Sequence, residues 1–262
     1  MIPINEIRAW SNIVPWINDE QIEQDLVICR SLVEIFSDKL LAENLAFRGG
    51  TALHKLFLHP QPRYSEDIDL VQKKSGPIKE VIIRLRKALS YISEPVIKQK
   101  ANNNTLLFRF NSENTTPIPL RLKVEINCRE HFTVYGFKDV AFSIDTKWFK
   151  GETNIQTYEL EELLGTKLRA LYQRKKGRDL FDLYKAITVA KPATDKIIAC
   201  YHEYMKFVVG KSPTRKQFLL NMDAKLLDND FINDTAFLLR TTEKYNPDEA
   251  YELVKKEILE KL

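Results

Sequence analysis

The segment over residues 45–71 constrains the fold of this chain more than any other part of the sequence. Residues 45–48 have the composition of a short strand, Gly49-Gly50 indicates a turn, and residues 51–57 have the pattern of a short helix. A second short strand is predicted over residues 67–71. This succession of strand, glycine turn, helix and strand predicts a domain in which helices pack on a β-sheet.

The remainder of the N-terminal half adds further helices and strands. Residues 21–41 and 78–89 repeat apolar side chains at helical spacing, so each predicts an amphipathic helix. Additional strands are predicted over residues 96–99, 105–110, 120–127 and 141–144. In the strand over residues 120–127 apolar and polar side chains alternate strictly, which predicts one face in the core and one polar face.

From residue 159 onward the sequence has only helical patterns. Helices are predicted over residues 159–173, 177–189, 194–208, 214–226 and 248–259. Ser212-Pro213 and Asn246-Pro247 favour helix starts, because each places a capping side chain before a proline. We therefore expect an α+β domain over residues 1–150 and an all-helical domain over residues 151–262.

The composition fits an ordinary globular protein. Hydrophobic residues make up 44% of the chain and charged residues 29%, which argues against a disordered protein. The formal net charge is only +4, so a nucleic-acid partner would need a local basic patch. The three cysteines form no zinc or disulfide pattern, and no apolar run has signal-peptide or membrane-spanning length. We expect a soluble, cytoplasmic protein with no membrane partner.

Two aspartates carry the first chemical signal. Residues two apart in a strand project to the same side, so Asp67 and Asp69 present two carboxylates on one face. Magnesium prefers oxygen ligands from one or two carboxylates together with substrate phosphates. The pair alone is a weak signal, because an ordinary surface strand often carries spaced acids.

The glycine pair before these aspartates strengthens the signal. Gly49 and Gly50 allow backbone N–H groups to approach an anion, and the helix that follows, opened by Thr51 as its cap, adds unpaired donors. The alternative is a tight turn that needs positive φ. Glycine turn, helix and Asp-x-Asp strand in succession resemble the polymerase-β-like nucleotidyltransferases.

A third carboxylate is expected on a neighbouring strand in such proteins, and Glu125 lies on the polar face of the strand over residues 120–127. Glu125 would bridge a catalytic metal or activate an acceptor hydroxyl. The alternative is a strand glutamate paired with Lys123 or Arg121.

A lysine on the first helix of the C-terminal half is a further candidate. Lys167 interrupts the apolar stripe of the helix over residues 159–173, so it needs an anionic partner. That partner is either a triphosphate or a carboxylate in a structural pair. Asp179 and Asp182 lie three apart on the next helix, where they would orient Lys167, Arg174 or a metal, or form plain surface salt bridges.

Four motifs together resemble the AbiEii/AbiGii family of toxins from type IV toxin–antitoxin systems. In order, they are Arg-Gly-Gly-Thr-Ala-Leu-His-Lys at 48–55, Arg-Tyr-Ser-Glu-Asp-Ile-Asp-Leu at 63–70, Lys-Val-Glu-Ile-Asn at 123–127, and Lys167 followed by Arg-Lys-Lys-Gly-Arg-Asp-Leu-Phe-Asp-Leu at 174–183. The resemblance spans residues 45–184, and the helices after Val189 carry no motif of the family.

The resemblance implies a small polymerase-β-like nucleotidyltransferase domain and a helical lobe, with a nucleoside triphosphate between them. The residues that it implies as catalytic are Asp67, Asp69, Glu125, Lys167 and Asp182, with Mg²⁺ on Asp67, Asp69 and Glu125. The residues that it implies for the triphosphate are Gly49, Gly50, Thr51, Ser65 and Lys167. The wider superfamily has Gly-Ser where this chain has Gly-Gly, which leaves Thr51 as the expected hydroxyl donor.

The predicted activity is transfer of a nucleoside monophosphate from a nucleoside triphosphate to an RNA acceptor, the 3′ end of tRNA, which inhibits translation and growth. The implied partner is a cognate antitoxin, with or without a stable complex. Two alternatives stay open. The acceptor would be a protein or small molecule, or the chain would be a catalytically silent module that binds RNA or a partner protein.

Overall fold

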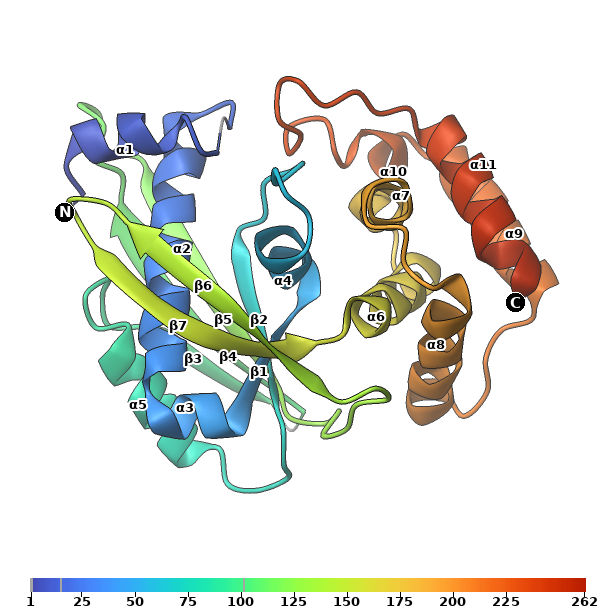
Figure 1. Cartoon of the computed structure of the whole chain (residues 1–262), viewed down its shortest axis with the longest axis horizontal. Coiled ribbons are helices and arrows are strands. Elements are labelled where there is room, and N and C mark those ends of the chain that lie inside the picture. The colour runs from blue at the N-terminus through green and yellow to red at the C-terminus, as the bar shows by residue number, and fades with distance from the viewer. Residues whose placement is uncertain (1, 15, 101) are drawn as a thin grey trace. The chain divides into compact units, whose positions relative to one another are not determined.

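A mixed β-sheet organises the N-terminal part of the chain (Figure 1). The computed structural model describes residues 2–14, 16–100 and 102–262, and within these residues seven strands pair in the order β3-β4-β5-β2-β1-β7-β6. The strands are β1 (Leu45–Arg48), β2 (Asp67–Gln72), β3 (Val96–Lys100), β4 (Asn103–Asn111), β5 (Pro119–Asn127), β6 (Phe137–Asp145) and β7 (Lys150–Tyr158). β1 and β2 are antiparallel, whereas β2 and β5 are parallel.

The chain divides into two units. Unit 1 comprises Met1–Leu56, Arg63–Thr133 and Phe137–Tyr158, and unit 2 comprises Phe57–Pro62, Val134–Gly136 and Glu159–Leu262. The sequence placed a boundary at residue 150. Strand β7, which the sequence did not predict, crosses that position and extends unit 1 to Tyr158.

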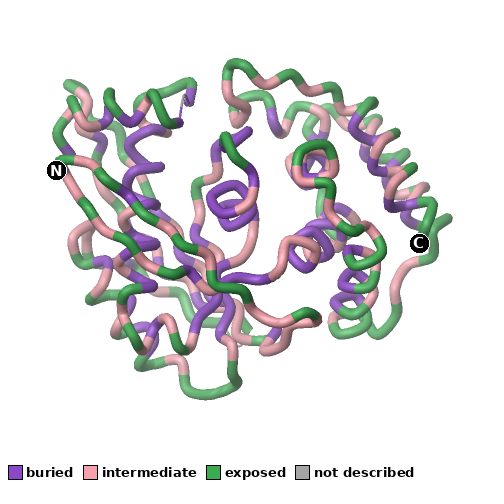
Figure 2. The backbone as a smooth tube through the Cα atoms, in the orientation of Figure 1, coloured by how far each residue is buried: buried purple, intermediate pink, exposed green. Residues whose placement is uncertain are grey.

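The helices of unit 1 are α1 (Ile4–Trp10), α2 (Asp19–Ser37), α3 (Lys39–Asn44), α4 (Gly49–Leu56) and α5 (Lys79–Ala88). The single helix predicted over residues 21–41 is two helices, because Asp38 has an extended backbone and its carboxylate accepts a hydrogen bond from Leu41 N (3.1 Å) to cap α3. Helix α2 contacts β5, β6 and β7, and Figure 2 shows buried residues along it.

The predicted alternation of β5 is confirmed. Leu122, Val124 and Ile126 are fully buried, whereas Lys123 and Glu125 are partly exposed on the other face. The buried side chains form the apolar layer of unit 1, so the polar face of β5 is available for chemistry.

A single buried carboxylate joins three helices of unit 1. Asp25 in α2 accepts hydrogen bonds from Trp10 Nε1 in α1 (2.8 Å) and from Lys55 Nζ in α4 (2.6 Å). All three side chains are buried. The opposite charges of Asp25 and Lys55 compensate each other inside the unit.

Unit 2 is helical. Its helices are α6 (Leu160–Gln173), α7 (Gly177–Val189), α8 (Thr194–Val209), α9 (Arg215–Leu226), α10 (Asn229–Asn233) and α11 (Pro247–Glu257), followed by a 3₁₀ turn at Leu259–Lys261. Five of these were predicted to within two residues, and the short α10 was not predicted. Asn246 caps α11 as expected, but α9 is capped by Thr214 and not by Ser212. The α+β N-terminal part and helical C-terminal part confirm the predicted fold class.

Close packing in unit 2 depends on two glycines. A Cβ at Gly165 would lie 2.5 Å from Cys200 Cβ, so the absence of a side chain lets α6 approach α8. A Cβ at Gly177 would lie 2.0 Å from the carbonyl oxygen of Phe231, so the start of α7 sits directly against α10.

In the part of the chain that the structure describes, no helix is both long and apolar enough to span a bilayer.

Candidate functional site

Three acidic side chains lie on one face of adjacent strands in unit 1. The parallel register of β2 and β5 pairs Asp69 with Glu125 and Asp67 with Lys123. Residues paired directly across neighbouring strands point to the same face, so these four side chains gather there. The side chains of Asp67 and Glu125 are 31% and 32% exposed, which leaves both within reach of a ligand.

The positive charge among these carboxylates is the ammonium of Lys123. Its Nζ lies 2.8 Å from Asp67 Oδ2 and 3.6 Å from Glu125 Oε2. Burial by itself would lower the pKa of Lys123, but its hydrogen bond to Asp67 and the nearby negative charges, including that of Asp69, outweigh burial and raise the pKa. Of the two partners suggested for Glu125, the ion pair forms with Lys123.

The glycine turn packs directly on one of the carboxylates. Gly49 has a φ of +81°, and a Cβ at this position would lie 2.2 Å from Asp69 Oδ2. Only glycine fits both the backbone conformation and the close approach. The turn and the Asp69 carboxylate are therefore held as one structural unit.

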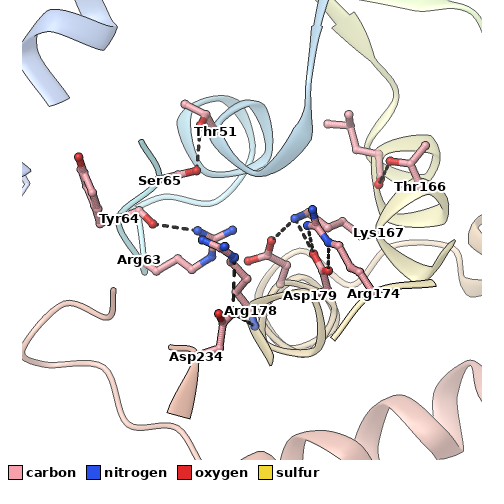
Figure 3. Close-up of polar contacts among 12 residues, drawn as sticks. Thr51, Arg63, Tyr64, Ser65, Thr166, Lys167, Arg174, Arg178, Asp179 and Asp234 are labelled. Atoms are coloured by element: carbon pink, nitrogen blue, oxygen red, sulfur yellow. Dashed lines mark hydrogen bonds and ion pairs between the residues drawn. The ribbon is translucent and has the colours of Figure 1, made fainter. Parts of the chain in front are cut away.

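The hydroxyl of Thr51, which the sequence predicts to face a phosphate, is hydrogen-bonded within unit 1. Thr51 is buried, and its Oγ1 donates to the backbone carbonyl of Asp67. Its oxygen also lies 2.8 Å from Ser65 Oγ, and Figure 3 draws this contact between the two side chains. Since the Thr51 proton is already donated, the Ser65 hydroxyl donates in this second bond. Helix α4 begins at Gly49, so Thr51 is not its N-cap, and the partly exposed Ser65 is better placed to meet a phosphate.

Two arginines of the sequence motifs have specific positions although sequence reasoning gave them no role. Arg48 pairs with Asp69 across β1 and β2, and its Nη1 lies 2.6 Å from Oε2 of the buried Glu130. Arg63 is buried, and its Nη1 donates to the carbonyl of Tyr64 (2.8 Å), next to Ser65 (Figure 3). The signal in the sequence was their position at the start of the first two motifs.

Unit 2 contains a separate buried charge cluster. Lys167 Nζ in α6 lies 3.0 Å from Asp179 Oδ1 and 2.8 Å from Asp182 Oδ2 in α7. Arg174 adds two hydrogen bonds to Asp179, of 2.6 and 2.8 Å (Figure 3). Both aspartates are fully buried. The predicted orientation of Lys167 by these aspartates is thus present, and the carboxylate partner considered for Lys167 is the one that it has.

Burial and neighbouring charges shift the pKa values of this cluster in opposite directions. Burial by itself would raise the pKa of Asp179, but the charges of Lys167 and Arg174 outweigh it and lower the pKa. Burial lowers the pKa of the neighbouring Lys225 to about 8, against the opposing charge of Asp179. Lys225 donates to the carbonyls of Leu171 and Tyr172, which are among the otherwise unpaired acceptors at the end of α6.

The basic run after α6 is largely compensated by acidic side chains. Lys175 pairs with Asp228, while Lys176 Nζ and Arg178 Nε lie 3.4 and 3.5 Å from carboxylate oxygens of Asp234. The side chains of Lys175 and Lys176 still have 52% and 47% of their surface exposed. The run therefore joins α7 to α10 and also presents two cations to solvent.

The described residues contain no ready-made cluster of metal-ligating side chains. Among residues 2–14, 16–100 and 102–262, no group of three or more His, Cys, Asp or Glu side chains is arranged so that it could hold a metal ion. The acidic face of β2 and β5 instead surrounds the Lys123 ammonium.

Known proteins resemble this chain in sequence profile and in fold. The sequence profile of a family described as the nucleotidyl transferase AbiEii toxin of type IV toxin–antitoxin systems matches residues 30–256. MenT4, a nucleotidyltransferase toxin of Mycobacterium tuberculosis, is similar in structure, with a TM-score of 0.66 and 15% identity over 100% of this chain and 91% of that one. JHP933 of Helicobacter pylori has a TM-score of 0.55 and 18% identity over 93% and 95%. At such identities the likeness to both structures shows the fold alone. No curated protein sequence matches the chain.

Proposed function

The chain belongs to the AbiEii family of nucleotidyltransferase toxins of type IV toxin–antitoxin systems, and from this premise we propose that its acceptor is RNA, at the 3′ end of tRNA. The reaction joins the α-phosphorus of a nucleoside triphosphate to an acceptor hydroxyl, and pyrophosphate leaves. Blocked tRNA would stop translation and growth in the cytoplasm, and a cognate antitoxin would relieve the arrest. A protein or small-molecule acceptor is the alternative for the same chemistry.

The acidic face of unit 1 fits a magnesium ion in its donor chemistry. Its three carboxylates are hard oxygen ligands on paired strands, and they already surround one cationic group. Asp67 and Asp69 would hold the ion, with Glu125 as the third ligand or as the base that accepts the proton of the acceptor hydroxyl. A bound magnesium ion would neutralise charge on the triphosphate and on the leaving pyrophosphate.

The observation that carries the proposal is the contact between Gly49 and Asp69. The backbone at the start of α4 offers N–H donors to phosphate oxygens. This backbone approaches Asp69 closely, because a Cβ added at Gly49 would lie only 2.2 Å from Asp69 Oδ2. Phosphate donors and a metal ligand are thus fixed against each other before any substrate binds. Ser65, oriented by Thr51, would add a hydroxyl donor.

Lys167 and Asp182 enter the proposal through the family motif. Lys167 holds its charge in a buried position between two carboxylates, so its ammonium is fixed in place and not mobile. Within unit 2, we propose that Asp179 and Asp182 orient the Lys167 ammonium. Arg174 compensates the remaining charge of Asp179, which keeps the cluster neutral.

The direct test is incubation of the purified protein with each labelled nucleoside triphosphate, magnesium and total RNA. The proposal expects the wild-type protein to label the tRNA band and the Asp69→Asn variant to leave it unlabelled. The matched control is Asp145→Asn, because Asp145 is an exposed strand aspartate of β6 that pairs only with Lys150 among the contacts described. Label on protein or a small molecule would support the alternative acceptors, and transfer unchanged in Asp69→Asn would refute the assigned site.

A further inference from the structure

Lys123 lies among the carboxylates of the acidic face, and the proposed reaction gives it no role. Lys123 lies opposite Asp67 in the register of β2 and β5, and two residues before Glu125 on the same face of β5. Its ammonium contacts Asp67 Oδ2 at 2.8 Å and Glu125 Oε2 at 3.6 Å. These oxygens belong to side chains that we assign to the metal.

Electrostatics explains why a cation is needed there. Three carboxylates on one face of two paired strands repel one another, and like charges on neighbouring strands destabilise a sheet. One ammonium among them offsets part of that repulsion, because it lies within ion-pair distance of both Asp67 and Glu125. Unit 1 therefore forms the acidic face without requiring a metal ion.

The same contact opposes metal binding. An ammonium donates hydrogen bonds to carboxylate lone pairs, and a divalent cation binds the same lone pairs. Two cations side by side on Asp67 would also repel each other. The Lys123 ammonium therefore competes with a metal ion for the lone pairs of Asp67 Oδ2 and Glu125 Oε2.

We propose that Lys123 is a built-in counter-ion of the metal site, which holds the carboxylates in place and which a divalent cation must displace in order to bind. This inference rests on the proposed assignment of Asp67, Asp69 and Glu125 to the metal. Lys123 is a positioning residue, because it acts on the ligands of the metal. With the Lys123 ammonium present, the three carboxylates bind a free divalent cation more weakly than they would without it.

The test measures Mn²⁺ binding without nucleotide, by the electron paramagnetic resonance signal of the free ion. Lys123→Met removes the charge and keeps the length of the side chain. A partly exposed ion pair changes an equilibrium constant by at most a few-fold. Because Mn²⁺ must compete with two such pairs, their loss in Lys123→Met should raise the Mn²⁺ affinity by about tenfold. Lys98→Met on β3 is the matched control, because Lys98 is an exposed strand lysine on the same face of the sheet but two strands away from Glu125 through Thr105. It removes the same charge at a greater distance, so it should change Mn²⁺ affinity much less than Lys123→Met.

A second measurement uses the wild-type protein, so it does not depend on the folding of a variant. Acetylation of lysines by a brief pulse of reagent, read by mass spectrometry, should rise severalfold at Lys123 when Mn²⁺ is added and stay constant at Lys98. Displacement frees the ammonium from Asp67 and Glu125, which is why its reactivity should increase.

The outcomes separate this inference from the proposed function. Equal or weaker Mn²⁺ affinity in Lys123→Met, or unchanged labelling of Lys123 at saturating Mn²⁺, would overturn the displacement even if nucleotide transfer occurs. Absence of Mn²⁺ binding in every protein would overturn it as well. Nucleotide transfer that survives Asp69→Asn would instead overturn the proposed function.

Discussion

Replacement of Gly49 by alanine should both destabilise unit 1 and stop nucleotide transfer. The backbone of Gly49 has a φ of +81°, a conformation that costs a non-glycine residue about 1–2 kcal/mol. The new Cβ would also lie 2.2 Å from Asp69 Oδ2, so the carboxylate must move, and such overpacking typically costs about 1–3 kcal/mol. The expected loss is therefore about 2–5 kcal/mol of the free energy of unfolding.

Urea unfolding followed by tryptophan fluorescence is the appropriate assay, because all three tryptophans of the chain, Trp10, Trp16 and Trp148, belong to unit 1. In folded Gly49→Ala protein, transfer should fall about 100-fold or more, since the displacement of Asp69 would misplace the proposed metal ligand by about 1 Å.

Three further variants separate the two costs. Gly76→Ala has open space and no positive φ, so it should be nearly neutral. Gly210→Ala has a φ of +77° and open space, so it should show the backbone cost alone, and calorimetric melting measures that cost because unit 2 contains no tryptophan. In an Asp69→Ala background, Gly49→Ala should cost only the backbone part, because the clash is gone. If Gly49→Ala is no more destabilising than Gly210→Ala, or if removal of the Asp69 carboxylate gives no relief, the contact argument is wrong.

Four other predictions follow from the charges. Lys167→Ala should lower the stability of unit 2 by about 3–5 kcal/mol, because it leaves buried carboxylates uncompensated, and calorimetric melting with unchanged Tm would contradict this. Since the pKa of Asp179 is lowered in the fold, its stabilising effect should be complete above its ordinary pKa of about 4 and lost as pH falls further, and acid titration of Asp179→Asn should lack that part of the slope. Replacing Lys175 and Lys176 by glutamine should flatten the salt dependence of RNA binding by roughly one unit per lost phosphate contact, with triphosphate binding unchanged, whereas an identical salt slope would show that the run only joins helices. Expression of the chain alone should arrest bacterial growth and Asp69→Asn should not, so equal growth curves for the two would count against toxicity by nucleotide transfer.

Most of the fold could be predicted from the sequence because its helices and strands have strong periodicity. Strand β5 alternates without a break, and α6 and α7 carry clear apolar stripes. Strand β7 was missed because its sequence is mostly polar and only Ile155, Thr157 and Tyr158 are buried. Such a strand is identified by its neighbours in the sheet, which no local pattern contains.

Some features of the candidate site follow from the local sequence, and others depend on contacts between segments that are far apart in the chain. The shared face of Asp67 and Asp69 follows from strand geometry alone, and the approach of a glycine to an anion follows from its missing side chain. The pairing of Lys123 with Asp67 depends on the register between β2 and β5, which are far apart in the sequence. Likewise, the bond from Thr51 to the Asp67 carbonyl depends on how α4 packs on β2, so the sequence suggested a phosphate for a hydroxyl that has a backbone partner.

The buried Asp25 carboxylate ties helix α4 to α1 and α2, which has a consequence for the dynamics of α4. Because Trp10 and Lys55 both donate to it, α1, α2 and α4 cannot separate without exposing a charge that has lost its partners. Amide protons of the three helices should therefore exchange with solvent through one shared opening event, and fraying of individual helix ends should contribute little. The hydrogen-bonded amides of α4 beyond its first turn should then exchange as slowly as those of a protein core, although the helix begins with two glycines.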